Sequence, residues 1–167
     1  MMAVIASVMV GTVLVITLLS CLSDIRSLSI PNAYSLAILL CFVPAWIAMP
    51  SVFAPLWQHV AAFFIVFIVT YAMFYKGMMG GGDVKLATAL SLWIGLRGMI
   101  PFIFSMSIVG GVLGVLTLII RKKKPFRHPR PGGWIGEVQA GRDAIPYGVA
   151  ISFGAWVVFF HTVLTLH

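Results

Sequence analysis

The chain has 167 residues, of which 61% are hydrophobic and only 9% charged, and its mean hydropathy is +1.09. A soluble domain is usually about a quarter charged, so this composition excludes a soluble globular protein and indicates a single-domain integral membrane protein. The net charge of +7 does not indicate nucleic-acid binding, because six of the eleven Lys and Arg residues fall between 121 and 130. Basic clusters beside apolar segments set membrane topology or contact anionic lipid.

Six apolar runs predict an all-α protein with six transmembrane helices, because a helix of about 20 apolar residues crosses a bilayer. They cover about 3–22, 33–49, 55–75, 84–96, 100–120 and 147–165. The first run is expected to be a span and not a cleaved signal peptide, because no basic residue precedes it. The polar connection 122–146 is rich in Pro and Gly and predicts an irregular loop.

The fourth run is short for a membrane span. Thirteen helical residues cover roughly 20 Å, against a hydrocarbon core about 30 Å thick. Either this helix begins below the membrane surface, or it continues past Arg97 and breaks near Pro101. In the first case the preceding glycines lie at membrane depth, where irregular backbone is tolerated only against protein or water. That alternative predicts a water-filled pocket around Asp83.

The distribution of basic residues predicts an orientation. Ten of the eleven Lys and Arg residues fall in the first, third and fifth connections, and Arg97 alone falls on the opposite side. Basic connections stay in the cytoplasm, so both termini are expected on the outer, periplasmic side. The ten residues are Arg26, Lys76, Lys85, Arg121, Lys122, Lys123, Lys124, Arg127, Arg130 and Arg142.

Two of the four acidic residues stand at the edges of apolar runs on the predicted cytoplasmic side. Asp24 follows the first run, and Asp83 follows Gly80-Gly81-Gly82 and precedes the fourth. A charged side chain at a bilayer is costly and marks a candidate functional site. Three glycines allow close approach of the backbone. Two carboxylates beside one water molecule are the minimum equipment for acid–base hydrolysis of a peptide bond.

Simpler structural roles exist for both aspartates. Asp24 suits a polar cap in a turn after a helix, and Asp83 suits a helix N-cap after a glycine linker. If both are catalytic, helix dipoles favour Asp83 as the base, because it opens a helix, and Asp24 as the acid, because it follows one. Such a pair titrates as a unit, so the sequence leaves open which aspartate is acid and which is base.

Three segments together resemble the prepilin leader peptidase family. They are Asp24-Ile-Arg-Ser-Leu-Ser-Ile-Pro-Asn32, Gly80-Gly-Gly-Asp83-Val-Lys-Leu86 and Ile145-Pro-Tyr-Gly148. The family comprises bacterial type IV prepilin peptidases and archaeal preflagellin peptidases. Its Gly-x-Gly-Asp motif names a wider class of intramembrane aspartyl proteases. The resemblance covers the whole chain, and it implies a multi-pass aspartic endopeptidase of the bacterial inner membrane whose active site faces the cytoplasm.

The resemblance also implies site residues and partners. It assigns Asp24 and Asp83 as the catalytic pair. It implies a prepilin or pseudopilin precursor as substrate, with a short basic leader followed by a hydrophobic helix, and membrane lipid as the other contact. It implies no cofactor, no metal and no nucleic acid, and it leaves the oligomeric state open. The expected substrate-binding or pocket-shaping residues are Pro31, Asn32, Gly80, Gly81, Gly82, Lys85, Pro146, Tyr147 and Gly148.

One departure from the family pattern bears on function. Larger bacterial members carry a cytoplasmic domain with cysteine pairs, which is associated with N-methylation. This chain has only Cys21 and Cys41 and no insertion between its first two runs. It therefore looks like the short form of tight-adherence (Flp) pilus systems, with one six-helix peptidase domain over 1–167 and no methyltransferase domain. Two alternatives remain, namely a non-enzymatic membrane subunit of a pilus or secretion assembly, and a small ion-coupled transporter.

Overall fold

The computed structural model describes residues 2–48 and 53–165, and every regular element in them is a helix. The all-α prediction is confirmed. The seven helices are α1 (Met2–Ser27), α2 (Asn32–Ala48), α3 (Leu56–Tyr75), α4 (Gly81–Ile94), α5 (Met99–Lys123), α6 (Trp134–Gln139) and α7 (Tyr147–Thr165). The predicted end of the second run, at residue 49, lies outside the described residues.

Three of the described helices are long and apolar enough to cross a membrane. They are the Val8–Ser27 part of α1, the whole of α3 and the whole of α5. α2 and α7 are shorter apolar helices. Most side chains on the outer faces of the long helices are exposed aliphatic and aromatic groups, which suits contact with lipid and not with water.

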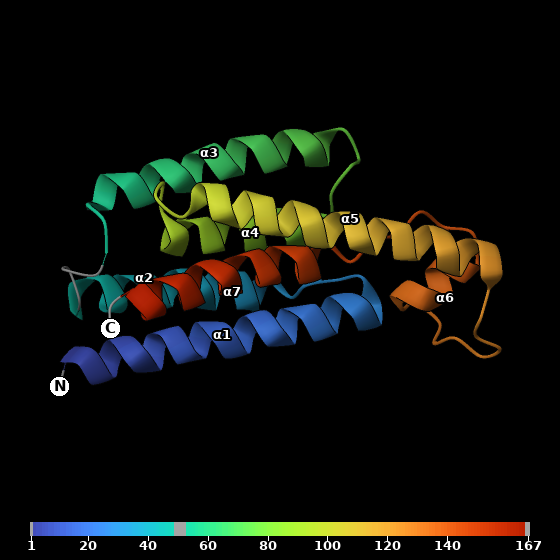
Figure 1. Ribbon diagram of the computed structural model, residues 1–167, viewed down its shortest axis with the longest axis horizontal. Coiled ribbons are helices and arrows are strands. Elements are labelled where there is room, and N and C mark those ends of the chain that lie inside the picture. The colour runs from blue at the N-terminus through green and yellow to red at the C-terminus, as the bar shows by residue number, and fades with distance from the viewer. Residues whose placement is uncertain (1, 49–52, 166–167) are drawn as a thin grey trace.

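The helices run along the long axis of the molecule, with α6 at one end (Figure 1). α4 is the central helix, because it packs against α2, α3, α5 and α7 and ten of its fourteen residues are buried. α1 packs against α2 and α7, and α5 packs against α7. The start of α1 and the end of α7 lie at the same end of the bundle, opposite α6 and the basic end of α5 (Figure 1).

α1 is longer than the sequence predicted. Its expected end near residue 22 is wrong, because the helix continues to Ser27. The backbone N–H of Leu28 donates to the carbonyl oxygen of Asp24 at 2.8 Å, and the helix ends where Leu28 takes a left-handed φ of 49°. Asp24 therefore lies inside the last turn of α1, and not in a turn that follows it.

α4 begins at the glycines and ends at a glycine. Gly95 has a φ of +64°, and its N–H bonds the carbonyl oxygen of Ser91 at 2.9 Å. The chain therefore breaks directly after Ile94, so of the two alternatives the structure excludes a helix that continues past Arg97 to a break near Pro101. Pro101 lies in the first turn of α5, where a missing N–H is tolerated. The water-filled pocket around Asp83 stays a prediction.

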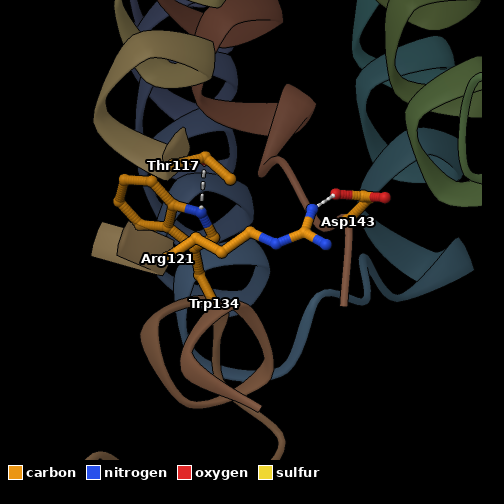
Figure 2. Close-up of polar contacts among 4 residues, drawn as sticks. All are labelled: Thr117, Arg121, Trp134 and Asp143. Carbon is orange, nitrogen blue, oxygen red and sulfur yellow. Dashed lines mark hydrogen bonds and ion pairs between the residues drawn. The ribbon is translucent and has the colours of Figure 1, made fainter. Parts of the chain in front are cut away.

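The prediction of an irregular loop over 122–146 is wrong for residues 134–139, which form α6. Trp134 and Val138 are one helical turn apart and both are buried, so their burial fixes a short helix. The Trp134 Nε1–H donates to Thr117 Oγ1 at 3.1 Å, and Arg121 forms an ion pair with Asp143. Figure 2 shows both contacts, which fasten this connection to the end of α5.

At the other end of the bundle, aromatic side chains pack around the last turn of α4. Five rings are in contact in this cluster, with centroids 5.2 to 6.2 Å apart: those of Phe42, Phe53, His59, Trp93 and Phe159. The His59 Nδ1 lies 2.7 Å from the Leu92 carbonyl oxygen. This aromatic cluster joins α2, α3, α4 and α7 through their side chains.

Candidate active site

Asp24 points from the last turn of α1 to the beginning of α7. Its carboxyl Oδ2 accepts a hydrogen bond of 2.7 Å from the backbone N–H of Gly148, the second residue of α7, and its side chain is only 4% exposed. The N-terminus of a helix favours negative charge. Asp24 therefore stands at the end of one helix and at the start of another, so the dipole argument drawn from sequence does not separate the roles of the two aspartates.

Asp83 is the third residue of α4. Its Oδ2 accepts a hydrogen bond of 3.3 Å from the backbone N–H of Gly80. Its Oδ1 is buried and has no hydrogen-bond partner among the described residues. Asp83 interacts electrostatically with Asp24, and the Gly148 N–H lies within reach of its carboxyl group too. The structure thus brings the two predicted catalytic residues together at the N-terminus of α7.

Glycines allow the helices to meet this closely. A Cβ atom on Gly148 would lie 2.7 Å from Ile30 Cδ1 and 2.8 Å from Asp24 Oδ2, both far inside van der Waals contact. A Cβ atom on Gly82 would lie 3.2 Å from Ile30 Cβ. The buried Ile30 side chain therefore fills the space between the two glycines. Gly148 has no room for a Cβ atom, and a Cβ atom at Gly82 would require Ile30 to shift by a few tenths of an ångström.

Ile30 is a site residue that the sequence reasoning missed. It lies between α1 and α2, directly before Pro31, and it is 6% exposed. The available signal was an apolar residue directly before a proline, which holds the backbone extended. Its position packs the connection against α4 and α7 at the carboxyl pair.

Three more of the predicted site residues lie at the beginnings of helices, namely Asn32, Lys85 and Pro146. The Lys85 Nζ donates to Asn32 Oδ1 at 2.8 Å and ties the beginning of α4 to the beginning of α2. Pro146 is buried directly before α7, where it precedes Gly148 by two residues.

Three other predicted residues have different surroundings. Gly81 faces Phe74 of α3, since a Cβ there would lie 3.5 Å from that ring. Tyr147 is half-buried against the main core, and Pro31 is exposed. Among the described residues, no three His, Cys, Asp or Glu side chains gather closely enough to hold a metal ion. The titratable groups that the structure brings together here are the carboxyl groups of Asp24 and Asp83.

Comparison with known proteins points to one family. The profile of the type IV leader peptidase family matches residues 5–115. A curated protein of Xanthomonas campestris pv. campestris, named prepilin leader peptidase/N-methyltransferase, is 38% identical over 88 residues, which cover 51% of this chain and 24% of that protein. The matched part thus spans about a quarter of that relative.

No solved structure matches the chain. The family match nevertheless covers more than half of the chain and contains both Asp24 and Asp83. On this basis the chain belongs to the type IV leader peptidase family.

Proposed function

We propose that the chain is a membrane aspartic endopeptidase that removes the short basic leader of prepilin-like precursors. One observation carries this proposal. Asp24 and Asp83, which are 59 positions apart in the sequence, are both buried at the same place, beside the Gly148 N–H. Burying two carboxyl groups side by side is costly, and such an arrangement is characteristic of aspartic proteases. Membership of the family supports the same reaction and substrate class.

The chemistry follows from the pair. One carboxylate removes a proton from a water molecule as its oxygen attacks the scissile carbonyl carbon, and the other carboxyl group donates its proton to the carbonyl oxygen. The tetrahedral intermediate then breaks the carbon–nitrogen bond, and a proton passes to the leaving amine. The unpartnered Oδ1 of Asp83 is an acceptor available to the water or to the substrate. The proposal leaves open which aspartate is the base and which is the acid.

We also propose the topology. α1 to α5 and α7 cross the bacterial inner membrane, both termini lie outside, and the carboxyl pair lies on the cytoplasmic side. The shared position of the start of α1 and the end of α7 supports an even number of crossings (Figure 1). Arg121, Lys122 and Lys123 end α5 at the opposite end, as the positive-inside rule requires. α4 is about 21 Å long, so its start lies below the membrane surface.

The proposed enzyme is the peptidase-only form. α1 and α2 are joined by residues 28–31 alone, which leaves no room for a domain between them. Both cysteines are free and lie within α1 and α2. N-methyltransferase, which is part of the relative's printed name, is therefore not proposed for this chain. The family match and the resemblance of the sequence to the tight-adherence (Flp) form support a pilin precursor as substrate.

Co-expression with candidate prepilin precursors, followed by N-terminal sequencing of the product, tests the function. We expect cleavage at one site and a loss of about 10³-fold or more in Asp24→Asn and in Asp83→Asn, because each removes a proton-transfer group. Asp143→Asn is the matched control, since the Asp143 side chain is 84% exposed and pairs with Arg121 at the end of α5; it should cleave at the wild-type rate. Wild-type cleavage by either active-site variant would refute the paired mechanism, and a non-enzymatic subunit would tolerate both changes.

A further inference from the structure

The hydrogen bond between Asp24 and Gly148 is one of a row of polar contacts between α1 and α7. Further along the two helices, the Ser152 hydroxyl donates to the carbonyl oxygen of Thr17 at 3.3 Å, and the Trp156 Nε1–H donates to Thr17 Oγ1 at 2.8 Å. The three residues of α7 are spaced by one helical turn and the two of α1 by two turns, so each set lies on one face of its helix. This polar row therefore ties one face of α1 to one face of α7.

Thr17 is the central residue of the polar row. It has no exposed surface, and it accepts hydrogen bonds from two side chains of α7, through its hydroxyl from Trp156 and through its carbonyl oxygen from Ser152. Its hydroxyl also donates to a carbonyl of α1 at 2.8 Å. The hydroxyls of Thr12 and Ser20 instead bond carbonyls of α1 itself, at 2.8 and 2.9 Å. Thr17 is thus the point on α1 where two side chains of α7 are held.

The two carboxyl groups stand on helices with different surroundings. Asp83 belongs to the central helix α4, whereas Asp24 belongs to α1, which packs against α2, α6 and α7. α7 contacts both α1 and α4, so its position along α1 affects where Asp24 lies relative to the rest of the site. Lipid is as apolar as the aliphatic side chains between helices, so hydrogen bonds across the interface help to select one register.

We propose that Thr17 and Trp156 are positioning residues, whose hydrogen bond fixes the register of α7 on α1 and so holds the Gly148 N–H on the Asp24 carboxyl group. The catalytic consequence rests on the proposed function. Thr17 precedes Asp24 by seven residues, about 10 Å of helix, and Trp156 follows Gly148 by eight, about 12 Å. Both residues therefore act through the helices that carry them and not by touching the reacting atoms.

Substitutions on both sides of the bond test the kinetic consequence. Thr17→Val keeps the shape of the side chain and removes the hydroxyl, and Trp156→Phe removes the indole N–H. Each should lower kcat per folded molecule about tenfold, because the carboxyl group is displaced, with KM for the precursor changed by less than about twofold. The double variant should lose no more than either single variant, because all three lack the same bond.

Two further variants separate the hydrogen bond from packing. Thr17→Ser keeps the hydroxyl and should restore most of the wild-type kcat. Thr12→Val is the matched control, because the Thr12 hydroxyl bonds the Val8 carbonyl of its own helix, and its kcat should equal that of the wild type. If Thr17→Ser were as slow as Thr17→Val, or if Thr17→Val lowered only the melting temperature, the positioning role would be refuted.

A spectroscopic measurement reports the register without catalysis. Tyr147–Gly148 is the one Tyr–Gly step in the sequence, so labelling Tyr carbonyls with ¹³C and Gly amides with ¹⁵N isolates the Gly148 amide in an NMR spectrum. Hydrogen bonds to carboxylates are short and strong, so this amide proton should resonate downfield. We expect it to move upfield in Thr17→Val and in Trp156→Phe, towards its position in Asp24→Ala, which lacks the acceptor.

The two proposals fail in different ways. An unchanged Gly148 resonance in both Thr17→Val and Trp156→Phe would overturn the register proposal, whatever the chain cleaves. A shifted resonance with unchanged kcat would overturn its catalytic part. A shifted resonance in a chain that cleaves no member of a precursor panel would refute the protease and leave the register of α7 on α1 assigned to the bond between Thr17 and Trp156.

Discussion

The two ends of the bundle are held together by different means. At the end that contains Asp24, Asp83 and Gly148, helices meet through carboxyl oxygens, backbone N–H groups and glycines that leave no space for a Cβ atom. At the opposite end, Phe42 and Trp93 belong to a cluster of large rings in edge-on and tilted contact.

The first end holds the two carboxyl groups in position, and the second end holds the helices together. A backbone N–H cannot rotate into another rotamer, so a hydrogen bond from it fixes a carboxyl group with little conformational freedom. Interlocked rings instead bring many atoms into van der Waals contact, and such packing holds helices together where the surrounding lipid is itself apolar. Substitutions at the carboxyl end should therefore change activity most, and substitutions at the aromatic end should change stability most.

Among the substitutions that compare the two ends, the largest effect is expected at Gly148. Gly148→Ala places a Cβ atom 2.7 Å from Ile30 and 2.8 Å from the Asp24 carboxyl group, so the carboxyl group must move. A displacement of this kind costs about 10²-fold in rate, to be measured as the rate of precursor cleavage. Gly111→Ala is the matched control, because a Cβ there meets nothing within 4 Å. Equal rates in both variants would mean that Gly148 does not position the pair.

The next effect is at the aromatic end. Phe42→Ala removes a buried ring that contacts Phe53, His59 and Trp93, and truncating such a side chain costs about 3–5 kcal/mol. We expect a lower unfolding temperature in detergent, with cleavage per folded molecule nearly unchanged at a permissive temperature. If Phe42→Ala lost activity while its melting temperature stayed the same, the division between the two ends would be wrong.

The smallest effect is expected in the connection that carries α6, away from both the carboxyl pair and the aromatic cluster. Arg121→Gln breaks the exposed ion pair with Asp143 (Figure 2), and exposed pairs contribute about 1 kcal/mol or less. Both melting temperature and cleavage rate should stay close to wild type. A fall in either one, comparable with that of Phe42→Ala, would show that the connection carrying α6 supports the bundle more than its contacts indicate.

Sequence was a good guide to which residues matter and a poor guide to how they are held. Asp24 and Asp83 stood out because a carboxylate is rare beside apolar runs, and the structure brings them together. Their catalytic role stays a prediction. The end of α1 was misplaced because the apolar run ends near residue 22 while the helix continues to Ser27. The bond from the Gly148 N–H to Asp24 joins residues 124 positions apart. No local pattern reports a bond of that range.

Other features depended on packing alone. Ile30 became part of the site because Gly82 and Gly148 approach it from two helices. α6 forms inside a Pro- and Gly-rich connection because Trp134 hydrogen-bonds Thr117 and packs in a small core. Ser and Thr are common in apolar helices. Only the tertiary structure shows that the hydroxyls of Ser35 and Thr88 have no hydrogen-bond partner among the described residues.

The placement of both aspartates on helical backbone has an entropic consequence. Asp24 lies within α1 and Asp83 within α4, so only their short side-chain torsions, and not a mobile loop, determine the distance between the two carboxyl groups. A site on loops would lose backbone freedom of about 1–2 kcal/mol per residue ordered when substrate arrives. For the proposed enzyme, we expect that ordering to be complete once the helices pack.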